Sequence, residues 1–312
     1  MESPIRRKLY RRHASELNKL VYQEDSIENI GPKDVLLKVH AVSLNYRDVN
    51  ILNGTNPWPV LTSGIPCSDA AGEIIAIGSD VKRFSVGDRV FPIVDQKSIT
   101  GQEQEREWLG GEVNGILASH LVFDEERLVK IPGYLSWTEA TSLPCAGVTA
   151  WTGLAVNGEL LRNKTILIQG LSATSSSLPW ILERAFADTF EIGTGGVSLM
   201  AAKLAAAADC KVILTSSSDE KLRRVNHIDG LAEAIPINYK TNPEWHEEAV
   251  RVNNMRGADI VIENGGTSSL LQSCAAVAKR GIISQVGYLG PQNTNDLKDL
   301  LPALIEKAIN LR

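Results

Sequence analysis

In the first half of the chain, short apolar runs alternate with clusters of turn residues. Four of these runs predict β-strands, over residues 35–42, 72–78, 89–94 and 120–123. Residues 1–30 are polar and predict an irregular start, and residues 95–114 predict a loop. Short strands at this spacing are typical of a small barrel. We therefore expect a barrel-like β domain over residues 1–135.

The periodicity changes after Ser136, which opens a capping box with Glu139 and so predicts a helix start. Five further apolar runs predict strands, over residues 165–169, 211–215, 234–237, 258–263 and 281–286. Amphipathic segments between and after them predict helices over residues 199–208, 219–226, 242–254 and 297–310. This alternation predicts an α/β fold with a doubly wound parallel sheet, a Rossmann domain over residues 136–312.

A glycine turn belongs to the first strand of that domain but is separated from it. The strand ends at Gln169, whereas Gly193 to Ser198, Gly-Thr-Gly-Gly-Val-Ser, leads into the next helix. A strand, a glycine turn and a helix form a dinucleotide-binding unit, in which the helix N-terminus holds the pyrophosphate. The 23 residues 170–192 interrupt it, and their removal rejoins the motif. We therefore interpret them as an insert foreign to the fold, for instance an intron retained in frame.

Composition excludes several partners of the 312-residue chain. A net charge of −5 gives no electrostatic reason to bind nucleic acid. No apolar run approaches the roughly 20 residues that span a bilayer, so we expect a cytoplasmic protein without a membrane partner. The four cysteines stand singly and form no C-x-x-C pair, which predicts reduced thiols and no zinc lobe.

Five sequence blocks then occur in a characteristic order: Ala41–Asp48, Ile65–Glu73, Val86–Val90, Leu143–Trp151, and Gln169 with Gly193–Val197. Together they resemble the medium-chain dehydrogenase/reductase superfamily, in its zinc-free, quinone-oxidoreductase-like (enoyl-reductase-domain) branch. The resemblance implies a GroES-like first domain, a Rossmann second domain and hydride transfer from a nicotinamide cofactor to a small molecule. It also implies a tendency to form homodimers. Relative to that family, the chain lacks the last strand and the segment that returns to the β domain.

The resemblance also bears on zinc. Zinc-dependent members place a cysteine where Asn45 stands, and asparagine is a poor zinc ligand. Residues 95–115 contain no cysteine cluster for a structural zinc. We therefore expect no metal, and a quinone, enone or similar conjugated carbonyl as the acceptor. Two alternatives stay open: a zinc-type alcohol dehydrogenase-like enzyme, and a catalytically inactive interrupted relative.

Three residues of the first block are candidates for catalysis. Tyr46 is the candidate hydrogen-bond donor or acid, although a tyrosine at a strand end often only packs. Asn45 is expected to orient the substrate or the nicotinamide, with a turn-capping amide as the alternative. Asp48 is either catalytic or the salt-bridge partner of Arg47.

The end of the second Rossmann strand decides between NADPH and NADH. An NAD enzyme usually carries an acidic residue there, whereas this chain has three serines followed by Asp219 and, nearby, cations such as Lys221. Small hydroxyls with cations suit a 2′-phosphate, so we expect NADPH rather than NADH, with Asp219 as the open alternative. The expected cofactor contacts are Thr149, Gly193, Thr194, Gly195, Gly196, Val197, Ser216, Ser217, Ser218, Lys221, Gly265, Val286 and Gly287.

Overall fold

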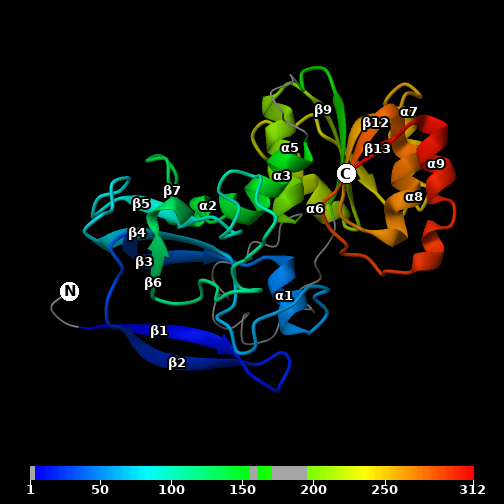
Figure 1. Ribbon diagram of the computed structural model, residues 1–312. Coiled ribbons are helices and arrows are strands. Elements are labelled where there is room, and N and C mark those ends of the chain that lie inside the picture. Colours follow the sequence, from blue (N-terminus) through cyan, green and yellow to red (C-terminus); the bar gives the residue numbers. More distant parts are fainter. Residues whose placement is uncertain (1–3, 155–160, 171–194) are drawn as a thin grey trace. The chain divides into compact units, whose positions relative to one another are not determined.

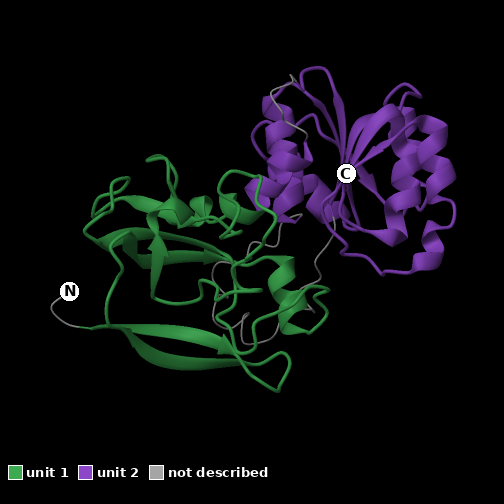
Figure 2. Ribbon diagram, viewed as in Figure 1, with its two compact units in different colours: residues 1–145, 177–185 green, residues 146–176, 186–312 purple. Residues whose placement is uncertain are grey.

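The computed structural model describes residues 4–154, 161–170 and 195–312, which belong to two compact units (Figure 2). The first unit contains the described residues up to Cys145, and the second those from Ala146 onward. The domain boundary expected after residue 135 precedes helix α2 (Trp137–Ala140), which belongs to the first unit. Apart from Gly170, the interpreted insert lies outside the described residues.

The first unit is built on a five-stranded antiparallel sheet in the order β6-β3-β4-β5-β7. Its strands are β3 (Asp34–Ser43), β4 (Asp69–Ile77), β5 (Arg89–Pro92), β6 (His120–Asp124) and β7 (Leu128–Lys130). The four predicted strands are confirmed, and only the three-residue β7 was absent from the prediction. Helix α1 (Tyr46–Leu52) follows β3 directly, and the 3₁₀ turn Glu125–Arg127 joins β6 to β7.

The prediction of an irregular start is wrong. Strands β1 (Ile5–Arg12) and β2 (Leu20–Ile27) form an antiparallel hairpin in register from Ile5 opposite Ile27 to Arg12 opposite Leu20 (Figure 1). Most of their side chains are polar, and Leu9, Arg12 and Ile27 are the buried ones. The hairpin therefore lacks the apolar alternation by which a strand is recognised in a sequence.

Arg12, at the end of β1, fixes two distant loops of the first unit. Its side chain is only 7% exposed. Nη1 donates to the carbonyl of Gly110 at 2.7 Å, and Nη2 donates to the carbonyl of Leu61 at 3.0 Å. Burial lowers the pKa of the Arg12 guanidinium, partly offset by the nearby Asp48 carboxylate. The chain start is thus an integral part of this unit.

The second unit contains a six-stranded parallel sheet in the order β10-β9-β8-β11-β12-β13. Its strands are β8 (Thr165–Gln169), β9 (Lys211–Ser216), β10 (Ile235–Asn238), β11 (Ala258–Glu263), β12 (Val277–Gln285) and β13 (Asn310–Leu311). All five predicted strands are confirmed. The short β13, absent from the prediction, pairs with β12 at Ile282 and Ile283.

Helices cover both faces of this sheet (Figure 1). One face packs against α3 (Val148–Gly153), α5 (Gly196–Ala207) and α6 (Asp219–Val225). The other packs against α7 (Trp245–Val252), α8 (Thr267–Ala276) and α9 (Leu300–Lys307). A π-helical turn, Leu143–Gly147, precedes α3, and the 3₁₀ turn Thr294–Leu297 precedes α9.

Strand β8 illustrates why the pattern specifies a central parallel strand. Ile166 and Ile168 pack toward α5, whereas Leu167 between them packs toward α8, and all three are fully buried. A strand covered on both faces is apolar at every position rather than at alternate ones. No helix within the described ranges is long and apolar enough to cross a membrane.

Lys307 closes the C-terminal end of α8, and its replacement tests that contact. Its ammonium donates to the carbonyls of Cys274, Ala275 and Val277 at 3.0, 2.5 and 3.0 Å. We expect Lys307→Met to lower the free energy of unfolding by about 1–3 kcal/mol, because these carbonyls lose a charged donor. The matched control is Lys203→Met on the exposed face of α5. Equal effects of both variants in urea denaturation would contradict the capping role.

Candidate functional site

The first polar cluster lies where α1 begins in the first unit. Asn45 is the N-cap of α1, and its backbone N–H donates to Asp48 Oδ2 at 2.8 Å. Asn45 Nδ2 donates to Oδ2 of Asp69, the first residue of β4, at 2.5 Å. Two predicted site residues, Asn45 and Asp48, are thus brought together with an acid that the sequence analysis missed.

Asp69 is a carboxylate held by neutral donors. It is 1% exposed, and besides Asn45 it accepts the Ser68 hydroxyl at 2.6 Å on Oδ2 and the Cys145 backbone N–H at 2.7 Å on Oδ1. Burial raises the pKa of Asp69 to about 7, and the nearby Asp48 acts in the same direction. Its position inside the block Ile65–Glu73 was the only sequence signal that could have marked it.

Asp48 is also buried, and its two oxygens differ. Oδ2 accepts the Asn45 N–H, whereas Oδ1 is buried without a hydrogen-bond partner and lies 3.9 Å from Arg47 Nη1. Burial raises the pKa of Asp48, and the Arg47 charge opposes that shift. Arg47 itself donates to the carbonyl of Leu109 at 2.8 Å. The geometry fits a loose ion pair between Asp48 and Arg47. This pair was one of the two roles that the sequence suggested for Asp48, the other being catalysis.

Tyr46 is the first residue of α1 and is half-buried. Its hydroxyl has no hydrogen-bond partner among the residues that the structure describes. A phenol without a structural partner is free to bind a ligand, so the role of Tyr46 as a hydrogen-bond donor stays a prediction.

A buried acid also organises the second unit, at the carboxyl ends of β8 and β11. Glu263 ends β11 and is fully buried. Its Oε1 accepts the backbone N–H groups of Gly265 and Gly266 at 2.6 and 3.1 Å and the Ser269 hydroxyl at 2.7 Å. Its Oε2 accepts Gln169 Nε2 at 2.6 Å and the Ser273 hydroxyl. Donors from β8, from α8 and from the loop between β11 and α8 therefore converge on one carboxylate.

Gln169 and Asn264 extend this network to α5. Gln169 Oε1 accepts the backbone N–H of Asn264 at 3.0 Å. The Gln169 carbonyl accepts both Asn264 Nδ2 at 2.8 Å and the hydroxyl of Ser198, on α5, at 2.7 Å. The network fixes the edge of the sheet at which parallel α/β folds bind their ligands.

Three predicted cofactor contacts belong to this edge and have structural tasks there. The N–H of Gly265 is already bonded to Glu263 and to Gln169, and a Cβ at Gly265 would lie 2.1 Å from Ser269 Oγ. The N–H groups of Val286 and Gly287 donate to the Glu263 carbonyl at 2.9 and 3.3 Å. These backbones shape the edge, and a contact with a cofactor stays a prediction for all three.

The start of α5 fits a bound anion. Its N-cap is Gly195, which has no side chain. The N–H groups of the first turn, at Gly196 and Val197, therefore receive no side-chain cap from the N-cap position. Such a helix N-terminus suits a pyrophosphate. Gly193 and Thr194 lie outside the described residues, and Thr149 is half-buried on α3. The residues present thus fit a dinucleotide.

The end of β9 carries hydroxyls. Ser216 is buried, and its Oγ accepts the N–H of Ser218 at 3.3 Å, while Ser217 is half-buried. Ser218 is the N-cap of α6 and accepts the N–H of Lys221. The Asp219 carboxylate accepts Asn238 Nδ2 at 2.6 Å and is therefore engaged with β10.

Metal ligands do not gather around Asn45 in the described part of the chain. The one group of three His, Cys, Asp or Glu ligand atoms found close together within the described ranges is Glu244, His246 and Glu247, at the start of α7. That group lies in the second unit, whereas Asn45 lies in the first.

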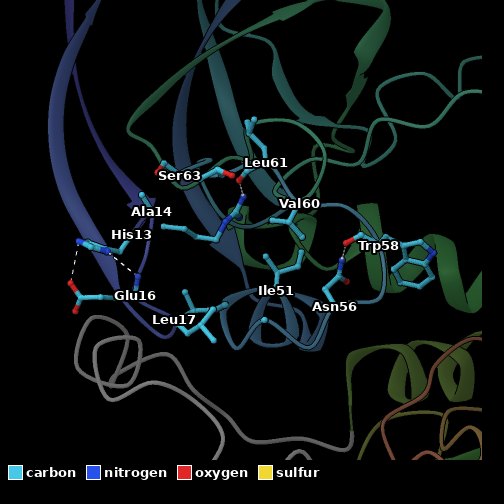
Figure 3. A pocket seen from close by; sticks show the side chains of 14 residues that line it. His13, Ala14, Glu16, Leu17, Ile51, Asn56, Trp58, Val60, Leu61 and Ser63 are labelled. Atoms are coloured by element: carbon cyan, nitrogen blue, oxygen red, sulfur yellow. Dashed lines mark hydrogen bonds and ion pairs between the residues drawn. The ribbon is translucent and has the colours of Figure 1, made fainter.

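A separate pocket of about 310 Å³ lies in the first unit beside α1 (Figure 3). Leu17, Ile51 and Leu61 provide apolar walls, and Trp58 lies on the opposite side from His13. None of the predicted site residues lines it. The buried cation at its base, Arg12, is already engaged by two carbonyls, so the pocket offers little to an anionic ligand.

Comparisons with known proteins agree with this architecture. Residues 31–133 match the family described as the alcohol dehydrogenase GroES-like domain, and residues 196–312 match the zinc-binding dehydrogenase family. A zinc-type alcohol dehydrogenase-like protein of Schizosaccharomyces pombe is 34% identical over 91% of this chain and 77% of its own length. A quinone oxidoreductase of Pseudomonas aeruginosa is 27% identical over 86% of this chain and 69% of its own. A crystal structure assigned as an alcohol dehydrogenase from Sinorhizobium meliloti superposes with a TM-score of 0.78 at 30% identity, covering 100% of this chain and 84% of that one.

The Glu263 network yields a stability prediction. Glu263→Gln replaces one acceptor oxygen with an amide N–H₂ group. That group would face N–H and O–H donors that now bond to the carboxylate. We expect the free energy of unfolding to fall by about 2–4 kcal/mol, because a buried donor is left without an acceptor. The control is Glu220→Gln, which breaks only the exposed pair with Arg224 and should cost below about 1 kcal/mol. Chemical denaturation compares them, and a neutral Glu263→Gln would refute the account.

Proposed function

The chain belongs to the medium-chain dehydrogenase/reductase superfamily of NAD(P)-dependent oxidoreductases, and we propose that it is a zinc-free, NADPH-dependent reductase of quinones, enones or similar conjugated carbonyls. The observation that carries the proposal is the Asn45 amide bound to Asp69 at the start of α1. The Asn45 amide and the Tyr46 hydroxyl are hydrogen-bond donors, and a conjugated carbonyl needs donors to its oxygen rather than a Lewis acid.

The preference for NADPH has its support in the second unit. Ser216 ends β9 and two further serines follow it, while the first acid after them, Asp219, is bonded to Asn238. An NAD enzyme would need that acid for the ribose hydroxyls. Lys221, half-buried on the first turns of α6, supplies a cation suited to a 2′-phosphate. The uncapped start of α5 would hold the pyrophosphate.

When bound, the nicotinamide supplies the hydride. The task of the protein is then to bind the acceptor, stabilise the charge on its oxygen and deliver a proton. Asn45 is the proposed orienting amide, and Tyr46, whose hydroxyl is unbonded within the described ranges, is the proposed proton donor, either directly or through water. Asp48 holds the backbone of Asn45 in the capping position.

The cellular setting follows from the same features. Cys67, Cys145, Cys210 and Cys274 form no disulfide, which suits a reducing compartment such as the cytoplasm. With a net charge of −5, a small-molecule substrate is a better partner than nucleic acid. A homodimer, as is common in the family, completes the proposal.

A second candidate, zinc-dependent alcohol oxidation, is favoured by the names of some relatives, among them the Schizosaccharomyces pombe protein. The decisive experiment is turnover by the purified chain after dialysis against EDTA. We expect NADPH-dependent reduction of a naphthoquinone or an enone at an undiminished rate, less than one zinc per chain, and no oxidation of simple alcohols. Alcohol oxidation that is lost with EDTA and restored by zinc would establish the second candidate instead. A folded chain that binds neither cofactor would be an inactive relative.

Cofactor choice is tested at Lys221. We expect Lys221→Ala to weaken NADPH binding about tenfold, or ~1.4 kcal/mol, and to leave NADH binding unchanged, because only NADPH carries the 2′-phosphate. Tryptophan fluorescence titration measures both affinities. Arg224→Ala is the control, since Arg224 already pairs with Glu220 at 2.9 Å. If Lys221→Ala weakened the binding of NADPH and NADH equally, the lysine would not bind the 2′-phosphate.

A further inference from the structure

Asp69 and Asn45 form a pair in which the acid can dictate the orientation of the amide. Asp69 accepts three donors, from Asn45, Ser68 and Cys145, and among the described residues it forms no ion pair with any Lys, Arg or His. An ionised carboxylate is an acceptor only, so the atom of Asn45 that faces it must be the Nδ2 amide nitrogen. The amide oxygen, Oδ1, is then directed elsewhere.

The backbone of Asn45 is fixed by Asp48, and its side chain also faces the Asp48 N–H in a capping box. Its N–H is bonded to Asp48 Oδ2 at 2.8 Å, and its carbonyl accepts the Asp48 N–H at 3.0 Å. Rotation of a terminal amide by half a turn exchanges oxygen and nitrogen in nearly the same volume. A change at Asp69 from acceptor to donor would therefore reverse the Asn45 amide. The amide would lose its capping contact with the Asp48 N–H, which keeps its bond to the Asn45 carbonyl at 3.0 Å.

We propose that Asp69 is a positioning residue, and that its protonation determines which end of the Asn45 amide faces the carbonyl that is being reduced. With Asp69 ionised, Asn45 Nδ2 is held by the acid. With Asp69 protonated, its O–H donates to Asn45 Oδ1, and Nδ2 turns away to donate to the substrate oxygen. One proton is taken up from solvent, and no bond other than that O–H is formed. The inference rests on the proposed function, in which Asn45 contacts the substrate.

The protonated arrangement is the one suited to reduction. Hydride transfer to a conjugated carbonyl places negative charge on its oxygen, and a preorganised N–H stabilises that charge whereas an amide oxygen repels it. Turnover should therefore decline as the pH rises and Asp69 ionises.

The neighbouring groups set the pH range of this change. The titratable groups that interact with Asp69 are Asp48 on α1 and Cys67 in the turn before β4. Arg47 on α1 and Arg12 on β1 act on those two groups. Burial raises the pKa of Asp69 to about 7, and Asp48 reinforces the shift. The pKa of the Cys67 thiol is raised well above its usual value by burial, so this thiol stays neutral. Asp69 is therefore set to titrate near neutral pH.

Asp69→Asn is the central test, because it mimics the protonated acid in shape and in hydrogen bonding. The new amide nitrogen would donate to Asn45 Oδ1, and its oxygen would still accept the Cys145 N–H. We expect wild-type kcat for the quinone to fall at least about tenfold between about pH 6 and pH 9, with little change in KM, since loss of one donor to an oxyanion costs on the order of 10²–10³. Asp69→Asn should keep the low-pH kcat throughout.

Asp69→Ala provides the second variant, because it removes both hydrogen-bonding states. It should have a low kcat that does not change with pH. The proposal is overturned if Asp69→Asn retains the wild-type pH profile, or if Asp69→Ala retains the wild-type kcat at low pH. Folding is checked by thermal unfolding at about pH 8, where Asp69→Asn should melt above the wild type. An ionised acid at this buried position destabilises the fold, and that loss grows as the pH rises from the unfolded pKa to the folded value of about 7.

A measurement without cofactor or substrate separates this inference from the proposed function. In NMR spectra of the full chain, the Asp69 carboxyl carbon should titrate near pH 7, and the side-chain amide resonances of Asn45 should shift with the same midpoint. Asn45 resonances that do not follow Asp69 would overturn the proposal whatever the activity. Coupled titration in a chain that reduces no quinone at any pH would support the Asp69–Asn45 pair and refute the proposed reaction.

Discussion

The second unit depends on a buried negative charge that is balanced entirely by neutral donors. Glu263 accepts five hydrogen bonds, from two backbone N–H groups, two serine hydroxyls and the Gln169 amide. A buried carboxylate is tolerated only when its lone pairs are satisfied, so the positions of β8, β11 and α8 at this edge are interdependent. This one acid therefore joins the elements at the edge where parallel α/β folds bind their ligands.

The first unit uses the same device with fewer donors. Asp69 accepts three hydrogen bonds, and they do not compensate for its burial, as the raised pKa indicates. Each unit thus contains an acid whose partners are amides, hydroxyls and backbone groups. Neither acid is paired with a cation among the described residues. Glu263 has five donors and organises the edge of its sheet, whereas Asp69 has three donors and a pKa that burial raises to about 7.

The sequence predicted the elements whose pattern is apolar and regular, and it failed where stability comes from polar contacts. Strands β8, β9 and β11 of the second unit are buried and mostly apolar at consecutive positions, and they were predicted correctly. The β1–β2 hairpin was missed because backbone pairing and Arg12 hold it, and neither leaves an apolar period. Helix α8 was missed because Ser269 and Ser273, which donate to Glu263, occupy inward positions where an amphipathic helix would have apolar residues.

The sequence likewise predicted only part of the candidate site. Asn45, Tyr46 and Asp48 follow one another closely on one turn, so a local motif sufficed to group them. Asp69 joins them only through a contact 24 positions away in the sequence. Such a partner is set by the pairing of β3 with β4, which a single sequence does not reveal.

The hairpin at the start of the chain also has a consequence for the order in which the protein folds. The Tyr10 N–H bonds to the carbonyl of Leu117, the Ser119 N–H bonds to the carbonyl of Lys8, and Arg12 reaches Gly110. During synthesis, β1 can pair with β2 early, but these further contacts form only after about a hundred more residues have left the ribosome. Contacts so distant in sequence slow folding, because the entropy of closing the loop is lost before the contacts form. The most N-terminal element is thus among the last to complete its contacts. Until then, β1 is not attached to residues 110–119 of the first unit.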